Sequence, residues 1–165
     1  MNSLKTLSPR LIVVLMMAVS GAVFFFAFLA EDLGGPSGIT LSDIPTGLLL
    51  RYIFAMAAGG ALAGFLLSGW FGRRGFLGGV LALLGAIVAA LIAGLFGSAI
   101  GLAPDILADG WQMKDIIPIG MGAAIVPLAF VSQPILLLPW LTLLVITQIW
   151  TKAARQRQAS SAAMA

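Results

Sequence analysis

The sequence of 165 residues contains no cysteine and no histidine. The chain therefore has no disulfide, no thiolate nucleophile and no imidazole ligand for a metal ion or a haem. Charged residues are also scarce, at 9% of the chain, whereas a soluble domain has about 25%. The apolar runs described below hold no acidic residue that could form a general acid–base pair. The sequence therefore predicts no enzyme activity, no cofactor and no metal site.

Hydrophobic residues make up 61% of the chain. The few charged residues cannot cover the surface of a soluble fold of this length, so most of the chain must face lipid or other apolar helices. The basic residues lie at the edges of the apolar runs, as in membrane proteins, and no nucleic-acid partner is predicted. The composition predicts an all-α integral membrane protein in contact with the lipid bilayer.

Three apolar runs are long enough to cross a bilayer as helices: residues 11–30, 47–70 and 76–102. At 1.5 Å per residue, the first of them covers the hydrocarbon core of roughly 30 Å. A loop rich in glycine and proline follows it, a tight turn at Arg73 and Arg74 separates the other two, and we expect Pro104 to end the third. These features predict three transmembrane helices.

The first run has a second interpretation, as a cleaved signal peptide. Its basic start and the small residues Ser20, Gly21 and Ala22 fit a processing site. The apolar run continues beyond that site to Phe26 and further, however, whereas the core of a signal peptide is usually about 7–15 residues long. We therefore favour a retained span.

The last apolar run, residues 116–151, would form a helix of about 54 Å, which is too long for one straight crossing. Two crossings would place the basic C-terminal segment outside, against the positive-inside rule, so we expect one proline-kinked span at residues 134–150. Residues 116–131 then form a kinked extension, an interfacial helix or a re-entrant segment. We expect residues 1–152 to form a single transmembrane domain and residues 153–165 a flexible cytoplasmic tail.

Charge is distributed asymmetrically over this plan. Seven of the nine basic residues lie in segments on one side: Lys5, Arg10, Arg73, Arg74, Lys152, Arg155 and Arg157. All six acidic residues lie on the other side: Glu31, Asp32, Asp43, Asp105, Asp109 and Asp115. By the positive-inside rule, this pattern predicts a four-helix transmembrane bundle with both termini in the cytoplasm, in a bacterial inner membrane.

Small residues recur every four positions on the second and third predicted helices. The rows comprise Gly60, Gly64 and Ser68 on the second helix, and Gly78, Ala82, Ala86, Ala90, Gly94 and Ser98 on the third. In a membrane, small side chains allow helix backbones to approach closely. Either the two helices pack on each other, or one row faces a partner protein or another copy of this chain.

Three polar residues are candidates for contact with an ion or a lipid. Arg51 lies inside the second apolar run, where it can extend to the interface or pair with Glu31 or Asp32. Ser132 and Gln133 precede Pro134 and would cap a helix break, a feature that transporters use to expose helix ends to substrates.

The rows of small residues and the lack of catalytic groups favour one function over others. We expect an accessory or assembly subunit that packs on other transmembrane helices, bound to a membrane-protein partner or to copies of itself. The alternative is a small homo-oligomeric transporter or pore that uses Arg51 or the break at Pro134.

Overall fold

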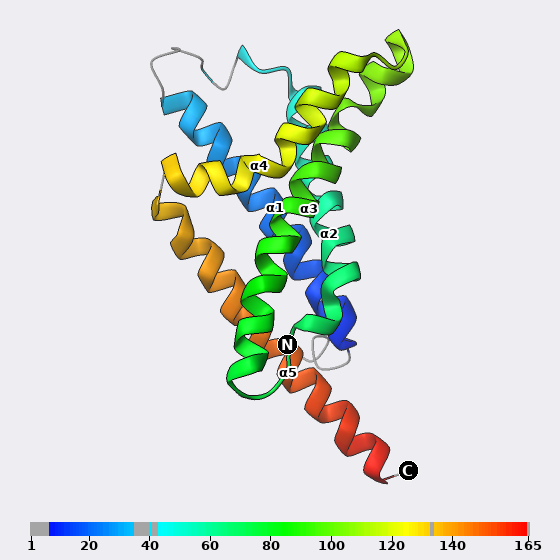
Figure 1. Ribbon diagram of the computed structural model, residues 1–165, viewed down its shortest axis with the longest axis vertical. Coiled ribbons are helices and arrows are strands. Elements are labelled where there is room, and N and C mark those ends of the chain that lie inside the picture. The colour runs from blue at the N-terminus through cyan, green and yellow to red at the C-terminus, as the bar shows by residue number, and fades with distance from the viewer. Residues whose placement is uncertain (1–6, 35–39, 41–42, 133, 165) are drawn as a thin grey trace.

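The computed structural model describes residues 7–34, 40, 43–132 and 134–164, and within these ranges its regular elements are all helices (Figure 1). In the described part of the chain, four helical stretches are long and apolar enough to cross a membrane: Pro9–Phe26, Thr46–Trp70, Gly75–Asp109 and Pro134–Ala163. The predicted all-α fold with four candidate membrane spans is thereby confirmed.

Three helices that pack along one another form the centre of the bundle. They are α1 (Pro9–Gly34), α2 (Thr46–Leu67) and α3 (Gly75–Asp109). Helix α2 packs against both α1 and α3. A short 3₁₀ turn, η3 (Ser68–Trp70), and the turn of residues 71–74 join α2 to α3 at the lower end of the view in Figure 1.

The last apolar run is divided into two helices. A 3₁₀ turn, η4 (Met113–Asp115), leads into α4 (Ile116–Ser132), and a second one, η5 (Pro134–Leu136), leads into α5 (Leu137–Met164). Helix α4 packs on α3 and α5 packs on α1. In Figure 1, α4 descends from the end of α3 to the left edge of the view, where α5 begins and continues to the lower end. The segment for which the sequence left three possibilities is thus a separate helix that packs on α3.

Helix α3 does not end at Pro104, so the predicted end of the third span is wrong. The helix continues to Asp109 with Pro104 in its interior. A proline removes one backbone hydrogen bond and disturbs the preceding turn, but a neighbouring helix can bond to the backbone groups that are released. Here the side chain of Arg51 on α2 donates to the carbonyl of Gly101 in that turn.

The predicted flexible tail also differs from the structure, because α5 remains helical to Met164. Its residues are mostly alanine, arginine and glutamine, which favour helix. The hydroxyls of Ser160 and Ser161 donate to backbone carbonyls one turn earlier, so they do not interrupt the helix. Ala154 is buried, which anchors the start of this segment to the bundle.

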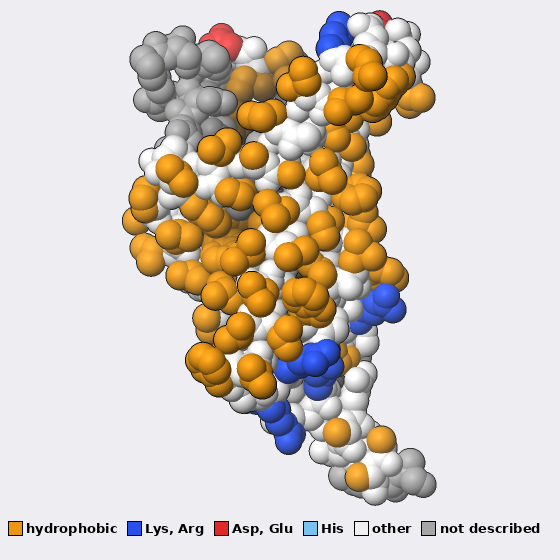
Figure 2. All heavy atoms as spheres, in the orientation of Figure 1, with side chains coloured by type: hydrophobic (Ala, Val, Ile, Leu, Met, Phe, Trp, Pro, Cys, Tyr) orange, Lys and Arg blue, Asp and Glu red, His pale blue; other side chains and the backbone are white. Residues whose placement is uncertain are grey.

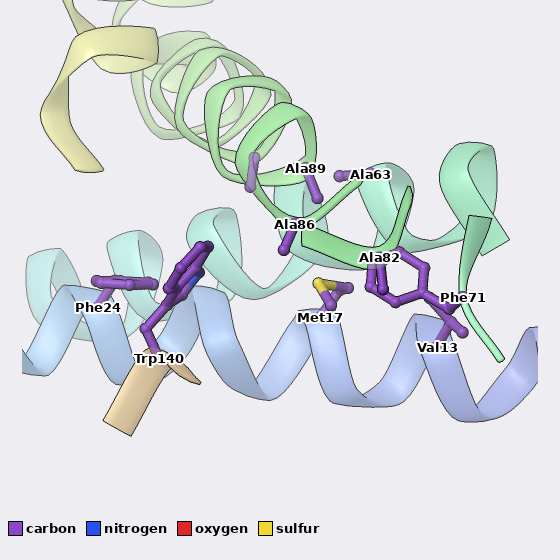
Figure 3. Packing of buried hydrophobic residues seen from close by; sticks show 10 residues of the cluster. Val13, Met17, Phe24, Ala63, Phe71, Ala82, Ala86, Ala89 and Trp140 are labelled. Carbon is purple, nitrogen blue, oxygen red and sulfur yellow. The ribbon is translucent and has the colours of Figure 1, made fainter. Parts of the chain in front are cut away.

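The hydrophobic core lies where α1, α3 and α5 meet (Figure 3). Small residues of α3, among them Ala82, Ala86 and Ala89, face the larger Val13 and Met17 of α1. This pairing of small with large side chains fills the space between closely spaced helices. The α2–α3 turn contributes Phe71, which is fully buried, and α5 contributes Trp140.

Candidate functional site

The small residues of α2 contact α1. A Cβ atom on Gly60 would overlap the backbone of Met17, and one on Gly64 would lie 2.8 Å from the carbonyl oxygen of Val13. The backbones of α1 and α2 are therefore as close as they can be at these two turns. Ser68 lies beyond the end of α2, where its hydroxyl donates to the carbonyl of Phe65.

The small residues of α3 also contact helices of the same chain. A Cβ atom on Gly94 would overlap the backbone of Gly122 on α4, and one on Gly122 would overlap the Ser98 side chain. Ala82 and Ala86 are buried in the core, and Gly78 contacts the turn that precedes α3. The structure therefore uses these rows for packing inside the chain, with α1 and α4 as the main neighbours.

A small cavity of about 20 Å³ lies at the centre of the bundle. Its walls come from α1, α2, α3 and α5 and include Ala90, Trp140 and one polar side chain, Ser20. A cavity of this size has room for about one water molecule. It is therefore a packing defect between helices and is too small to serve as a passage for solutes.

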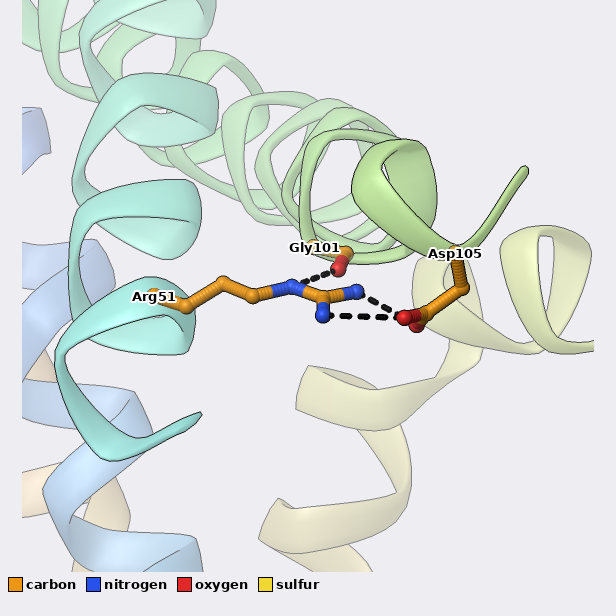
Figure 4. A network of polar contacts seen from close by, with 3 residues as sticks. All are labelled: Arg51, Gly101 and Asp105. Carbon is orange, nitrogen blue, oxygen red and sulfur yellow. Dashed lines mark hydrogen bonds and ion pairs between the residues drawn. The ribbon is translucent and has the colours of Figure 1, made fainter. Parts of the chain in front are cut away.

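Arg51 joins α2 to α3 at the end of the bundle opposite the α2–α3 turn, whose Arg73 and Arg74 belong to its basic end (Figure 4). Its guanidinium forms two parallel hydrogen bonds with the carboxylate of Asp105, of which Nη1 to Oδ1 measures 3.1 Å, and Nε donates to the carbonyl of Gly101. Such forked bonds fix the orientation of both groups. The exposed fractions of the two side chains are 22% for Arg51 and 59% for Asp105, so the pair lies at the edge of the bundle.

The sequence did not predict this partner for Arg51. The sequence suggested Glu31 or Asp32, because the end of α1 and the start of α2 are neighbours in the sequence. The side chains of these two acids lie outside the described residues. The pairing with Asp105 depends on the continuation of α3 past Pro104. The ring of Tyr52 beside it contacts Gly101 and stacks on Phe25 of α1, so this end of the bundle is linked across three helices.

A double-mutant cycle tests the ion pair. We expect Arg51→Met and Asp105→Asn to show a coupling of about 1 kcal/mol in the free energy of unfolding, because each substitution removes the same forked contact. Unfolding would be followed in mixed detergent micelles with increasing dodecyl sulfate. Asp109 is exposed one turn further along α3 and provides the control. An equal coupling between Arg51→Met and Asp109→Asn would contradict a specific pair.

The acidic residues outside the spans do not gather. In the described part of the chain, no group of three or more acidic, histidine or cysteine side chains lies close enough to hold a metal ion. Asp43 instead accepts hydrogen bonds from the backbone N–H and the hydroxyl of Thr40, each 2.7 Å long. These bonds favour the carboxylate and hold the pKa of Asp43 below its usual value of 3.8.

Gln148 of α5 binds the turn between α2 and α3. Its side-chain oxygen accepts a 2.7 Å hydrogen bond from the N–H of Gly72, and its amide donates to the carbonyl of Arg73. Gly72 has a φ of 74°, which favours glycine, and a Cβ atom there would lie 2.7 Å from the Thr151 side chain. The turn is therefore clamped against α5, a role that the sequence analysis did not give to Gln148.

Family models, curated proteins and solved structures show no match to this chain. Its function therefore has to be inferred from its own geometry.

The junction of α4 and α5 is the remaining feature that the sequence singled out. Ser132 is the last residue of α4 and is exposed, and Gln133 lies outside the described residues. The first charged residue of α5, Lys152, comes fifteen positions after Leu137, so the junction lies about 23 Å along α5 from the basic end. Because α5 is tilted, the junction lies below the upper ends of α2 and α3 (Figure 1).

The junction has a packed side and an open side. On the packed side, the ring of Phe130 contacts Phe24 of α1 and Trp140 of α5, with centroid distances of 5.5 and 5.2 Å. On the open side, Val131 is 79% exposed and Ile135 is 64% exposed. The ends of two helices thus meet between two apolar candidate spans, beside apolar side chains that nothing in the described chain covers.

Proposed function

We propose that this chain is a non-catalytic accessory or assembly subunit that binds a transmembrane helix of another protein at the junction of α4 and α5. The observation that carries the proposal is the meeting of two helix ends beside exposed apolar side chains, at a distance from the basic end that would place it within the membrane. The proposal accounts for a chain without histidine or cysteine whose apolar helices fit a lipid bilayer.

The physical argument concerns backbone polar groups. Between α4 and α5 the chain leaves the regular α-helical backbone, which satisfies its own polar groups. In lipid, each unsatisfied group costs several kcal/mol, so non-helical backbone at membrane depth occurs where protein or water covers it. Val131 and Ile135 are apolar, which favours a protein helix over water as the cover.

The partner surface thus differs from the rows of small residues that the sequence suggested. Gly60, Gly64 and Gly94 already contact α1 and α4, so a partner could reach them only by displacing helices of the same chain. We further propose that both termini lie in the cytoplasm of a bacterium and that the membrane is the inner one. The basic side chains at the lower end of Figure 2 support this orientation.

A site-specific crosslink tests the proposal, and the absence of native cysteine makes it direct. Ile135→Cys would carry a short photoreactive crosslinker in native membranes, with Leu77→Cys, exposed on α3, as the matched control. We expect position 135 to yield one discrete adduct whose added mass differs from that of this chain, and position 77 to yield none. If the crosslinker reacted equally with lipid at positions 135 and 77, the result would contradict a partner helix that covers the α4–α5 junction.

The same experiment separates the second candidate function, a homo-oligomeric transporter. The helix break before Pro134 favours it, because broken helices direct their dipole ends at substrates. The cavity of about 20 Å³ inside one chain would require the solute to pass between copies. An adduct of twice the mass of the chain, together with solute flux in liposomes that is lost in Arg51→Leu, would favour the transporter over the accessory subunit.

A further inference from the structure

Among the residues that the structure describes, no acidic side chain lies at the basic end of the bundle. Arginine and lysine side chains surround the start of α1, the α2–α3 turn and the middle of α5, whereas the acidic residues of the sequence lie in or beside segments at the other end. Figure 2 shows this separation on one face, with red only at the upper end and most of the blue toward the lower end. Positive charge at the lower end is therefore balanced by groups outside the chain.

Beside a hollow of about 630 Å³ that residues of α5 alone line, the basic end has two open cavities lined by α5 together with other segments. The larger, of about 390 Å³, lies between the start of α1, the end of α2 and α5, and Arg10 and Arg155 line it together with Ser8 and Gln158. At roughly 30 Å³ per water molecule, it has room for more than ten waters. The smaller, of about 280 Å³, is lined by Arg74, Lys152 and Arg155. Arg155 thus contributes to both cavities.

The side chain of Arg155 is held in place and retains unused donor capacity. Its Nη2 donates to the carbonyl of Ser68 over 3.1 Å, which fixes the guanidinium between α2 and α5. Its Nε is buried and has no hydrogen-bond partner among the described residues. Because Nε is enclosed by protein atoms, a ligand in the cavities would meet the Nη end of this guanidinium, a cationic group suited to phosphate oxygens.

The start of α1 adds to the attraction for an anion. Pro9 and Arg10 line the larger cavity, so the positive end of the dipole of a 26-residue helix borders it. The guanidinium of Arg10 lies 3.7 Å from the centre of the Phe65 ring, which positions its charge at the rim. Two arginines from different helices and a helix end therefore border one cavity.

Exposed apolar side chains lie close in the sequence to the residues that line this cavity. Leu11 follows Arg10 on α1, Leu66 precedes the η3 turn on α2, and both side chains are exposed. A cationic cavity whose lining residues have exposed leucines as near neighbours along α1 and α2 fits a ligand with an anionic head and hydrocarbon chains, whereas a free phosphate would use only the cationic part. The ligand chemistry is that of a phosphate ester, and the exposed leucines favour a lipid as its source.

We propose that the cavity between Arg10 and Arg155 binds the phosphate of an anionic phospholipid, with its acyl chains along Leu11 and Leu66. The site is independent of the α4–α5 junction, because none of its lining residues belongs to that junction. It would tie α1, α2 and α5 together at the membrane surface.

Native mass spectrometry of the full chain tests the site. The protein would be released from micelles that contain equal amounts of phosphatidylglycerol and phosphatidylcholine, and the retained lipid would be counted. We expect preferential retention of phosphatidylglycerol, weakened about fivefold by Arg10→Gln and about twenty-five-fold by the double variant with Arg155→Gln. Arg157→Gln is the matched control, because it removes the same charge from α5 and lines neither of these two cavities, only the separate hollow on α5.

Each other result overturns the proposal. An equal loss in Arg157→Gln would show that retention depends on net charge alone, and equal retention of both lipids would show that the phosphate site does not select charge. Displacement of the lipid by millimolar inorganic phosphate would identify a free anion as the ligand. If Arg155→Gln lowers the midpoint of thermal unfolding, lipid retention by Arg10→Gln alone tests the site, because the Arg10 side chain packs at the rim of the cavity on the Phe65 ring.

Discussion

Gly60→Leu should destabilise the bundle by at least about 3 kcal/mol in the free energy of unfolding. Overpacking a membrane interface usually costs about 1–3 kcal/mol, and relief is normally found by rotation of a neighbouring side chain. At Gly60 the neighbour is the backbone of Met17, which cannot rotate away. Helices α1 and α2 would have to separate, which would also break the contact at Gly64 one turn later.

The measurement is unfolding in mixed micelles with increasing dodecyl sulfate, followed by far-ultraviolet circular dichroism and tryptophan fluorescence. Gly79→Leu provides the control, because it makes the same substitution in a helix where no atom lies within 4 Å of the added Cβ. We expect Gly79→Leu to unfold within about 0.5 kcal/mol of the unmodified chain. Equal stability of the two variants would contradict the close approach of α1 and α2.

Gln148→Leu should cost about 1–3 kcal/mol, because it leaves the N–H of the buried Gly72 without an acceptor. The carbonyl of Arg73 loses its donor at the same time. The turn between α2 and α3 would then be held mainly by the buried ring of Phe71, so we also expect faster hydrogen exchange at the Gly72 amide than in the unmodified chain.

Two further variants identify the cause of that loss. Gln156→Leu makes the same change at an exposed position of α5 and should alter stability by less than about 0.5 kcal/mol. Gln148→Glu keeps the acceptor for Gly72 and removes the donor to Arg73, so its stability should lie between those of the unmodified chain and Gln148→Leu. If Gln148→Leu were as stable as Gln156→Leu, the amide would not hold the turn.

The sequence predicted the spans most accurately where length and flanking charge act together. The second span, residues 47–70, agrees with α2 and η3 to within one residue at its start. The third begins one residue before its predicted start, but its end was wrong because proline was treated as a stop signal without regard to neighbouring helices. A proline is tolerated in a helix where another helix bonds to the backbone of the disturbed turn: Pro104 removes the donor to the carbonyl of Ile100, and Arg51 bonds to the next carbonyl, that of Gly101.

The candidate site was predictable only in part for a similar reason. Arg51 stood out as a charge in an apolar run, but its partner, Asp105, is 54 positions away in the sequence. Gln148 was visible as a polar residue in the last apolar run, and only the fold brings the N–H of Gly72 to it. Single-residue signals mark positions that need a partner, whereas the partner depends on which helices are neighbours.

The sequence by itself determined that this chain is helical and suited to a membrane, because hydrophobic runs of this length cannot be buried in a soluble fold and their backbone groups can be satisfied only within helices. It also determined the separation of basic from acidic ends. The tertiary structure alone decided which small residues face which helix. Gly94 and Gly60 have the same side chain and the same spacing pattern, yet one contacts α4 and the other α1, since helix neighbours depend on packing in three dimensions.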